Sequence, residues 1–216
     1  MVFKDCRGDA GQQALAEVGD RLQAVADTPF DIQVRAVEAP MANAFALPGG
    51  IVMVTDDLIE MAETPDELAA VIAHEAAHVE KRHVMQSVWR SLGVGLILDA
   101  AVGGGSGAGQ QAVLLAGSMN DLRYSREAET EADVRGMQLL EANGWSSRGM
   151  APFFRKIAAK GEGPESAMVK ELISSHPESE RRARAAEARA KSGRPALSPE
   201  AWAAVKASCQ AAPAKK

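Results

Sequence analysis

Residues 74–78 read His-Glu-Ala-Ala-His, inside a segment whose apolar residues recur at helical spacing. Positions four apart lie on the same face of a helix, so His74 and His78 can bind one ion from a single rigid element. Neutral imidazole is a preferred zinc ligand, and a carboxylate beside a zinc ion, here Glu75, can act as a general base. The same pattern also arises by chance as two surface histidines, and the rest of the chain decides between these readings.

A strong helix-start signal precedes this pentad. Thr64 can cap a helix, Pro65 suits its first turn, and Glu67 lies three residues after the cap. We therefore expect a helix from Pro65 to about Leu92. Its buried face is predicted to consist of four apolar residues at helical spacing: Leu68, Val71, Ile72 and Val79.

The remaining segments predict a small sheet and several more helices. Residues 31–38 alternate as a strand does, and residues 43–54 read as two β segments joined by a Pro-Gly-Gly turn. Helical patterns are found at 9–26, 57–62, 121–142, 147–160, 164–174, 177–191 and 198–211. The predicted fold class is therefore α+β and mainly α, with the sheet in the N-terminal part.

Composition and charge limit the class of protein to which this chain can belong. The 216 residues, 46% apolar and 25% charged, suffice for one sizeable globular domain with or without an appended helical piece. The net charge of −5 is mild and argues against a nucleic-acid partner. From residue 181 onward nine Lys or Arg stand against two acids, so residues 183–216 are predicted to form a basic, alanine-rich helical extension packed on the domain. Its basic face either contacts anionic lipid or an acidic partner, or is simply solvated.

Two cysteines, Cys6 and Cys209, stand near opposite ends of the chain and form no CxxC pair. They either form one disulfide, which would imply an oxidising compartment, or remain free thiols. The N-terminus lacks the apolar stretch of a secretory signal, so either the protein is cytoplasmic or its signal is absent from this sequence. The most apolar run, residues 92–102, is too short to cross a bilayer, which takes about 20 residues.

A catalytic zinc ion needs three protein ligands and an open position, so two histidines require a third donor. The segment 124–133 offers several acids. Glu129 and Asp133 are four residues apart and share a helix face, so one can bind the metal while the other orients a histidine. Glu127 and Glu131 fall on other faces and are expected to be solvated.

With these residues in view, the chain resembles gluzincin metallopeptidases related to the CAAX prenyl endopeptidase, the HtpX heat-shock protease and the mitochondrial protease Oma1. Members combine HExxH on one helix with Ser-Arg-x-x-Glu-x-x-Ala-Asp on a later one, which matches residues 125–133. Two further blocks are similar to family motifs, Asn-Ala-Phe-Ala-Leu-Pro-Gly-Gly at 43–50 and Ser-His-Pro-Glu-Ser-Glu-Arg-Arg at 175–182. The four blocks occur in the family's order.

The resemblance implies a zincin-like core, residues 1–182, that holds one zinc ion per chain. The implied zinc ligands are His74, His78 and Glu129. Glu75 would be the catalytic base. His176 would face the zinc, either stabilising the oxyanion of the substrate or filling a fourth coordination position.

The resemblance also assigns supporting roles. Asp133 would orient a ligand histidine, and Arg182 would either set the electrostatics of the cleft or pair with an acid. An edge strand would bind an extended peptide substrate through four residues: Asn43, Ala44, Phe45 and Ala46.

The resulting hypothesis is a zinc-dependent metalloendopeptidase that hydrolyses unfolded or misassembled proteins. The alternative is a latent, chaperone-like zinc protein that mainly binds misfolded clients. The named family members have membrane spans, whereas none is visible here, so we expect a compact bacterial member, periplasmic or membrane-associated, with a cytoplasmic location as the alternative. Contact with a membrane or an envelope protein would use residues 93–117 or the basic tail; the oligomeric state is not predicted.

Overall fold

The computed structural model describes residues 3–89, 124–161, 166–176 and 179–210. Helices dominate these residues, and a single four-stranded sheet has the order β1-β2-β4-β3. The strands are β1 (Lys4–Asp5), β2 (Gln33–Glu38), β3 (Ala44–Ala46) and β4 (Ile51–Thr55). The predicted α+β, mainly α class is therefore confirmed, and only the two-residue strand β1 went unpredicted.

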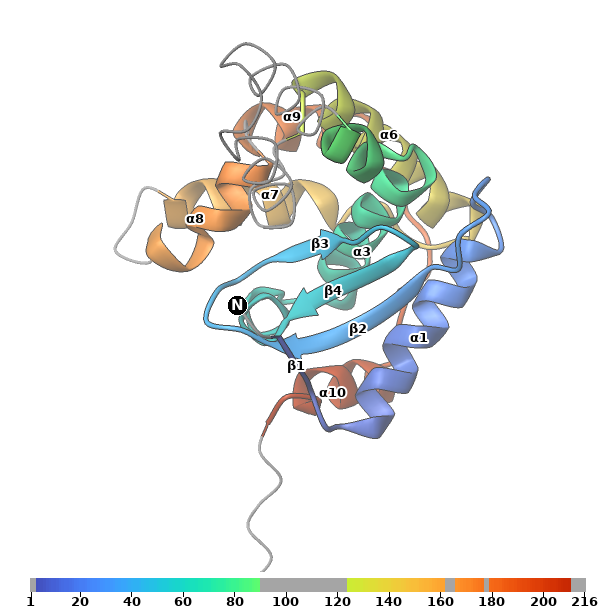
Figure 1. Ribbon diagram of the computed structural model, residues 1–216, viewed down its shortest axis with the longest axis vertical. Coiled ribbons are helices and arrows are strands. Elements are labelled where there is room, and N and C mark those ends of the chain that lie inside the picture. The colour runs from blue at the N-terminus through green and yellow to red at the C-terminus, as the bar shows by residue number, and fades with distance from the viewer. Residues whose placement is uncertain (1–2, 90–123, 162–165, 177–178, 211–216) are drawn as a thin grey trace, which may run out of the picture.

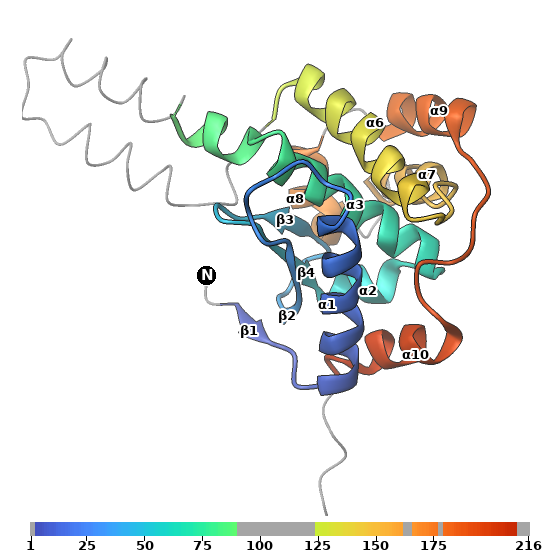
Figure 2. The ribbon, with the colours of Figure 1, turned by 90° about the vertical axis from the view of Figure 1, so that its right-hand side faces the viewer.

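The helices follow the predicted segments, although their bounds differ from the predicted ones. They are α1 (Asp9–Gln23), α2 (Asp56–Met61), α3 (Pro65–Glu80), α6 (Arg126–Ala142), α7 (Met150–Gly161), α8 (Ser166–Ser175), α9 (Ser179–Arg189) and α10 (Pro199–Ala207). In Figure 1, α3 runs behind the sheet, and Figure 2 shows α6 alongside α3. The sheet and α6 therefore enclose α3 between them.

The predicted hairpin is present and places β3 at an edge of the sheet. β3 pairs antiparallel with β4, while β4 pairs parallel with β2 on its other side. Gly49 and Gly50 adopt positive φ values of 94° and 99°, which glycine reaches without strain. A Cβ at Gly50 would lie 2.2 Å from the Asp31 carbonyl oxygen, so a larger residue cannot make this turn without displacing the chain.

Helix α3 is the central element of the fold. Thr64 caps it by accepting a hydrogen bond from the Glu67 N–H at 3.2 Å, as predicted. Every residue from Glu67 to Val79 is buried, not only the predicted apolar stripe. Such complete burial suits a helix covered on all sides by other elements.

The predicted continuation of this helix to Leu92 is wrong. α3 ends at Glu80, Arg82 takes a left-handed φ of 58°, and a separate helical segment begins at residue 83. Left-handed conformations are uncommon for residues other than Gly, Asn and Asp, so the sequence carries no signal for this turn. Leu92 itself lies outside the described residues.

The first and last described segments of the chain meet beside α1 and α10. Cys6 and Cys209 form a disulfide, which decides between the two alternatives left open for these cysteines. The Lys206 ammonium donates hydrogen bonds to carbonyls at the C-terminal end of α2, those of Ile59, Glu60 and Ala62. α10 is thus fastened to the body of the protein.

Two predictions about larger segments remain open. α9 runs across the predicted boundary between residues 182 and 183, and the division into 1–182 and 183–216 stays a prediction. Residues 93–117 lie outside the described part of the chain. Among the helices that the structure describes, none has the length and hydropathy to cross a membrane.

Candidate metal centre

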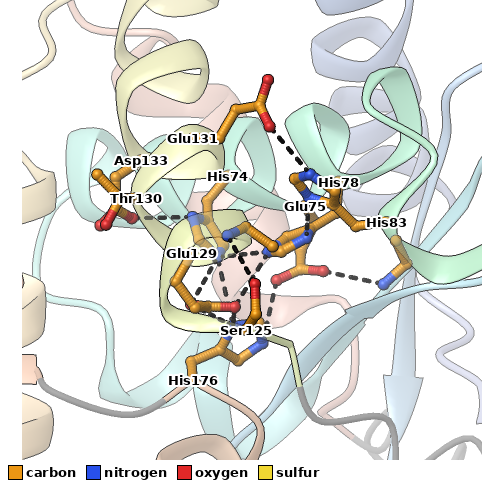
Figure 3. A network of polar contacts seen from close by, with 12 residues as sticks. His74, Glu75, His78, His83, Ser125, Glu129, Thr130, Glu131, Asp133 and His176 are labelled. Atoms are coloured by element: carbon orange, nitrogen blue, oxygen red, sulfur yellow. Dashed lines mark hydrogen bonds and ion pairs between the residues drawn. The ribbon is translucent and has the colours of Figure 1, made fainter. Parts of the chain in front are cut away.

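Four donor side chains from three parts of the chain converge in the interior. α3 supplies His74 and His78, α6 supplies Glu129, and His176 follows directly after α8. One ligand atom from each residue lies within 4.8 Å of those of the other three, and all four residues are buried (Figure 3). This group could hold a metal ion.

The close crossing of α3 and α6 brings Glu129 to the histidines. At Gly136, a Cβ atom would lie 3.0 Å from the backbone nitrogen of His74, tighter than ordinary contacts allow. Ser125 caps α6 by accepting a hydrogen bond from the Ala128 N–H at 3.2 Å, so Glu129 lies in the first helical turn. A small residue at the crossing and a capped start together set the position of this carboxylate.

In each of the two α3 histidines, Nε2 faces the centre of the donor cluster and Nδ1 faces away from it. Their Nε2 atoms lie 3.0 Å apart and 3.6 and 3.4 Å from the carboxylate oxygens of Glu129. The outer Nδ1 atom of His74 lies 3.0 Å from Asp133, and that of His78 lies 3.0 Å from His83. Each outer nitrogen thus has a partner of its own, and the inward Nε2 atoms remain for a metal. Two imidazole nitrogens and one carboxylate are a donor set that zinc accepts.

A buried arginine holds the acids of α6. The Arg182 guanidinium, 3% exposed, donates to both oxygens of Asp133 at 2.8 and 2.7 Å and lies 2.6 Å from Glu129. Burial disfavours the charged form of Asp133, but hydrogen bonds from Arg182 and His74 lower its pKa below the usual value. The arginine also stacks on the Phe154 ring, 4.2 Å from the centroid. Arg182 therefore pairs with two acids, one of the two roles that the resemblance implied.

Glu75 is fully buried between the donor cluster and the sheet edge. One of its carboxylate oxygens accepts a hydrogen bond from the Ala46 N–H at 3.0 Å, and the other lies 3.5 Å from His176 Nε2. Burial raises the pKa of Glu75, while His176 and His74 oppose the rise. A carboxyl group with a raised pKa is better matched to proton transfer near neutral pH.

The predicted edge-strand residues lie next to Glu75. Ala44, Phe45 and Ala46 form β3, whereas Asn43 precedes the strand. The Asn43 N–H donates to the Thr55 hydroxyl at 2.8 Å, and that hydroxyl donates to the Asn43 carbonyl. β3 is thus tied to β4 at its start and touches the acid at its end.

His176 stands between the two glutamates. Its Nδ1 atom lies 3.0 Å from both oxygens of Glu129 and 3.3 Å from His74 Nε2. Together with the 3.5 Å separation of Nε2 from Glu75, these distances leave its ring facing both the metal donors and the acid.

Comparison with known protein families agrees with a metal centre built from these residues. The sequence profile of peptidase family M48 matches residues 9–190. The chain belongs to peptidase family M48. The resemblance drawn from the sequence motifs is confirmed.

Curated relatives within this family are similar to the chain at about the same level. Over 200 residues it is 30% identical to mitochondrial metalloendopeptidase OMA1 of Schizosaccharomyces pombe, covering 82% of this chain and 57% of the relative. It is 32% identical over 156 residues to metalloprotease LoiP of Escherichia coli, covering 70% and 60%. It is 30% identical to the β-barrel assembly-enhancing protease of Yersinia pestis, covering 68% and 32%. The chain thus spans between a third and about 60% of the length of these relatives.

Three residues that line this donor cluster were not among the site residues predicted from the sequence. His83 is buried against His78, and its Nε2 atom lies 3.3 Å from Glu131. The Tyr124 ring stacks on His78 with centroids 3.9 Å apart. Glu131, expected to be solvated, has a half-exposed carboxylate that pairs with His83 and with Lys81.

The spacing of His83 explains why it was missed. On an uninterrupted helix, a residue five positions after His78 lies about 140° around the axis from it. The left-handed turn at Arg82 breaks that geometry and returns the imidazole to the site. Only the high local density of histidines, three within ten residues, could have drawn attention to it.

Proposed function

We propose that this M48 chain is a zinc-dependent metalloendopeptidase that holds one zinc ion on His74, His78 and Glu129. The observation that supports this proposal is the convergence of these donors beside a buried, hydrogen-bonded Glu75. Zinc bound there would polarise the scissile carbonyl and lower the pKa of a nearby water molecule. A site that served structure alone would need no general base next to its ligands.

Residues around the proposed zinc site would carry out proton transfer and substrate binding. Glu75 accepts the proton of the attacking water and delivers it to the leaving amine. The Ala46 N–H holds the Glu75 carboxylate in place, and the short edge strand β3 binds an extended peptide by strand addition. A small apolar cavity beside His74 and Glu75 supports binding of an apolar substrate side chain; it is lined by Val71, Met150, Phe153 and Leu172 among others.

For His176 we propose the role of fourth donor in a resting state. Its inclusion in the donor group supports this role over that of an oxyanion stabiliser. Displacing a fourth donor opens a coordination position, so His176→Ala should raise turnover of a peptide substrate. An oxyanion-stabilising role predicts the reverse, a loss of about 10²- to 10³-fold in kcat.

The names of the relatives and the disulfide support proposals for the substrates and for the compartment of this protein. We propose unfolded or misassembled proteins as substrates, because one group of relatives is named for enhancing β-barrel assembly. The Cys6–Cys209 disulfide supports an oxidising compartment such as the bacterial periplasm. Contact with a membrane or an envelope protein through residues 93–117 or the basic tail remains part of the proposal. The chaperone-like alternative leaves the position of Glu75 without a purpose and is not favoured.

The test is cleavage of a denatured casein-type substrate by chelated protein before and after adding zinc. Activity should appear only with zinc. Glu75→Gln should retain zinc and lose about 10²- to 10⁴-fold in kcat, because it removes the proton acceptor. Glu17→Gln, an exposed site on α1, is the matched control and should behave as wild type. Undiminished cleavage by Glu75→Gln would rule out this mechanism.

A further inference from the structure

His78 makes two contacts outside the donor cluster. Its Nδ1 atom lies 3.0 Å from the Nδ1 atom of His83, and its ring face is covered by Tyr124. The ring of His78 is fully buried, and His83 is 4% exposed. The outer edge of this imidazole therefore has a nitrogen of His83, rather than water, as its hydrogen-bond partner.

Metal binding by His78 determines the direction of that hydrogen bond. Nε2 must present a lone pair to the metal, so the proton of the neutral ring sits on Nδ1 and is donated outward. His83 Nδ1 must then accept, which places the proton of His83 on its own Nε2. That nitrogen lies 3.3 Å from Glu131, whose carboxylate accepts.

The backbone is shaped to produce this contact. Arg82 takes a left-handed conformation that a residue of its type rarely adopts, and it does so directly before His83. Lys81, on the other side of the turn, pairs with Glu131 at 3.0 Å. The turn thus supplies both the imidazole that meets His78 and a cation that holds the acid behind it.

We propose that His83 is a positioning residue for the metal ligand His78. Through one proton on each ring, the His78–His83–Glu131 chain selects the His78 tautomer whose Nε2 lone pair faces the metal. The inference rests on the zinc site proposed above and extends it to residues outside the donor set.

The experiment compares His83→Phe with His83→Gln. Phenylalanine fills the space but offers no acceptor, so zinc affinity should fall by about 10- to 100-fold, as for other outer partners of ligand histidines. Glutamine can offer an amide oxygen to His78 and should recover about tenfold of that loss. Zinc dissociation constants come from competition with a fluorescent chelator. The absorption spectrum of the cobalt(II)-substituted protein gives a second readout of ligand geometry.

Two α6 variants keep the test decisive if His83→Phe does not fold. Glu131→Ala changes a half-exposed side chain and should weaken zinc binding by about tenfold, because His83 loses its acceptor. Thr130→Ala, exposed on the same helical turn, is the control and should leave zinc affinity unchanged. Wild-type affinity in His83→Phe and Glu131→Ala, or equal losses in the Phe and Gln variants, would overturn the proposal. A wild-type protein that does not bind zinc would instead refute the metal site itself.

Discussion

His74 and His78 take equivalent places in the donor cluster, yet they are backed by different kinds of neighbours. Behind His74 lies a buried ion pair, Asp133 with the 3% exposed Arg182. Behind His78 lies the neutral ring of His83 and then the half-exposed carboxylate of Glu131.

A donor histidine can thus be oriented either by a buried ion pair or by a hydrogen bond to a neutral ring. Charges in a buried pair interact strongly, and removing one partner leaves the other uncompensated in a medium of low polarity. A pair at the surface is weakened by water and salt and contributes little to stability. We therefore expect His74 to depend on charge and His78 to depend on hydrogen-bond geometry.

The largest expected effect is on stability at the buried side. Arg182→Met leaves Asp133 and Glu129 without their cation, and it should lower the free energy of unfolding by about 3–5 kcal/mol. Lys81→Met removes the partner of Glu131 at the exposed side and should cost at most about 1 kcal/mol, because solvent screens that pair. Chemical denaturation of the chelated proteins measures both, and equal losses would erase the distinction.

The second effect is on metal affinity. Asp133→Asn keeps the size of the side chain but removes its charge, and it should weaken zinc binding by about 10- to 100-fold. Glu131→Gln keeps an oxygen that His83 can donate to, so its effect on the zinc dissociation constant should be smaller. A larger loss in Glu131→Gln than in Asp133→Asn would reverse the comparison.

The two α3 histidines of the donor cluster also differ in acidity when no metal is bound. Burial disfavours a charged His74, but its hydrogen bonds to Asp133 and Glu129 outweigh that effect and raise its pKa to about 9. Burial lowers the pKa of His78 well below the ordinary value, and Glu129 opposes this only in part. His74 is thus charged and His78 neutral in the same cluster when no metal is bound.

This difference predicts how stability depends on pH. Because the pKa of His74 rises from 6.5 to about 9 on folding, the folded state binds the extra proton within that window. The stabilisation is complete below pH 6.5 and is lost as the pH rises toward 9. Urea unfolding of chelated wild type should show this loss, and Asp133→Asn should reduce its slope; an unchanged slope in the variant would contradict the assignment.

The smallest effect is on salt dependence. Raising the ionic strength from about 0.1 M to 1 M shortens the screening length from about 10 Å to 3 Å. The small stability difference between Lys81→Met and wild type should disappear at the higher salt. The penalty of Arg182→Met should persist, since its pairs are buried. Parallel denaturation series at two salt concentrations test this, and a salt-sensitive Arg182→Met penalty would argue against burial as the cause.

Local patterns were sufficient for much of the fold. Thr64 and Pro65 start α3 where the capping rules place its beginning, and the Pro-Gly-Gly turn forms the predicted hairpin. These features depend on residues close in the chain, so they can be read from spacing alone. The end of α3 could not, because Arg82 adopts its left-handed turn without a residue type that favours it.

For the metal centre, the sequence by itself determined that His74 and His78 share a face and that Glu129 and Asp133 share another. The same pentad placed Glu75 beside the bound ion, and family motifs then pointed to His176 and Arg182; the catalytic roles of all three stay proposals. Only the tertiary structure decided which groups stand behind each ligand, because those contacts join α3 to α6, α9 and the turn after α3. Helical periodicity predicts only which residues are neighbours along one helix. His83, the partner of His78, follows the left-handed turn at Arg82, and Glu131, the partner of His83, lies on a second helix, α6.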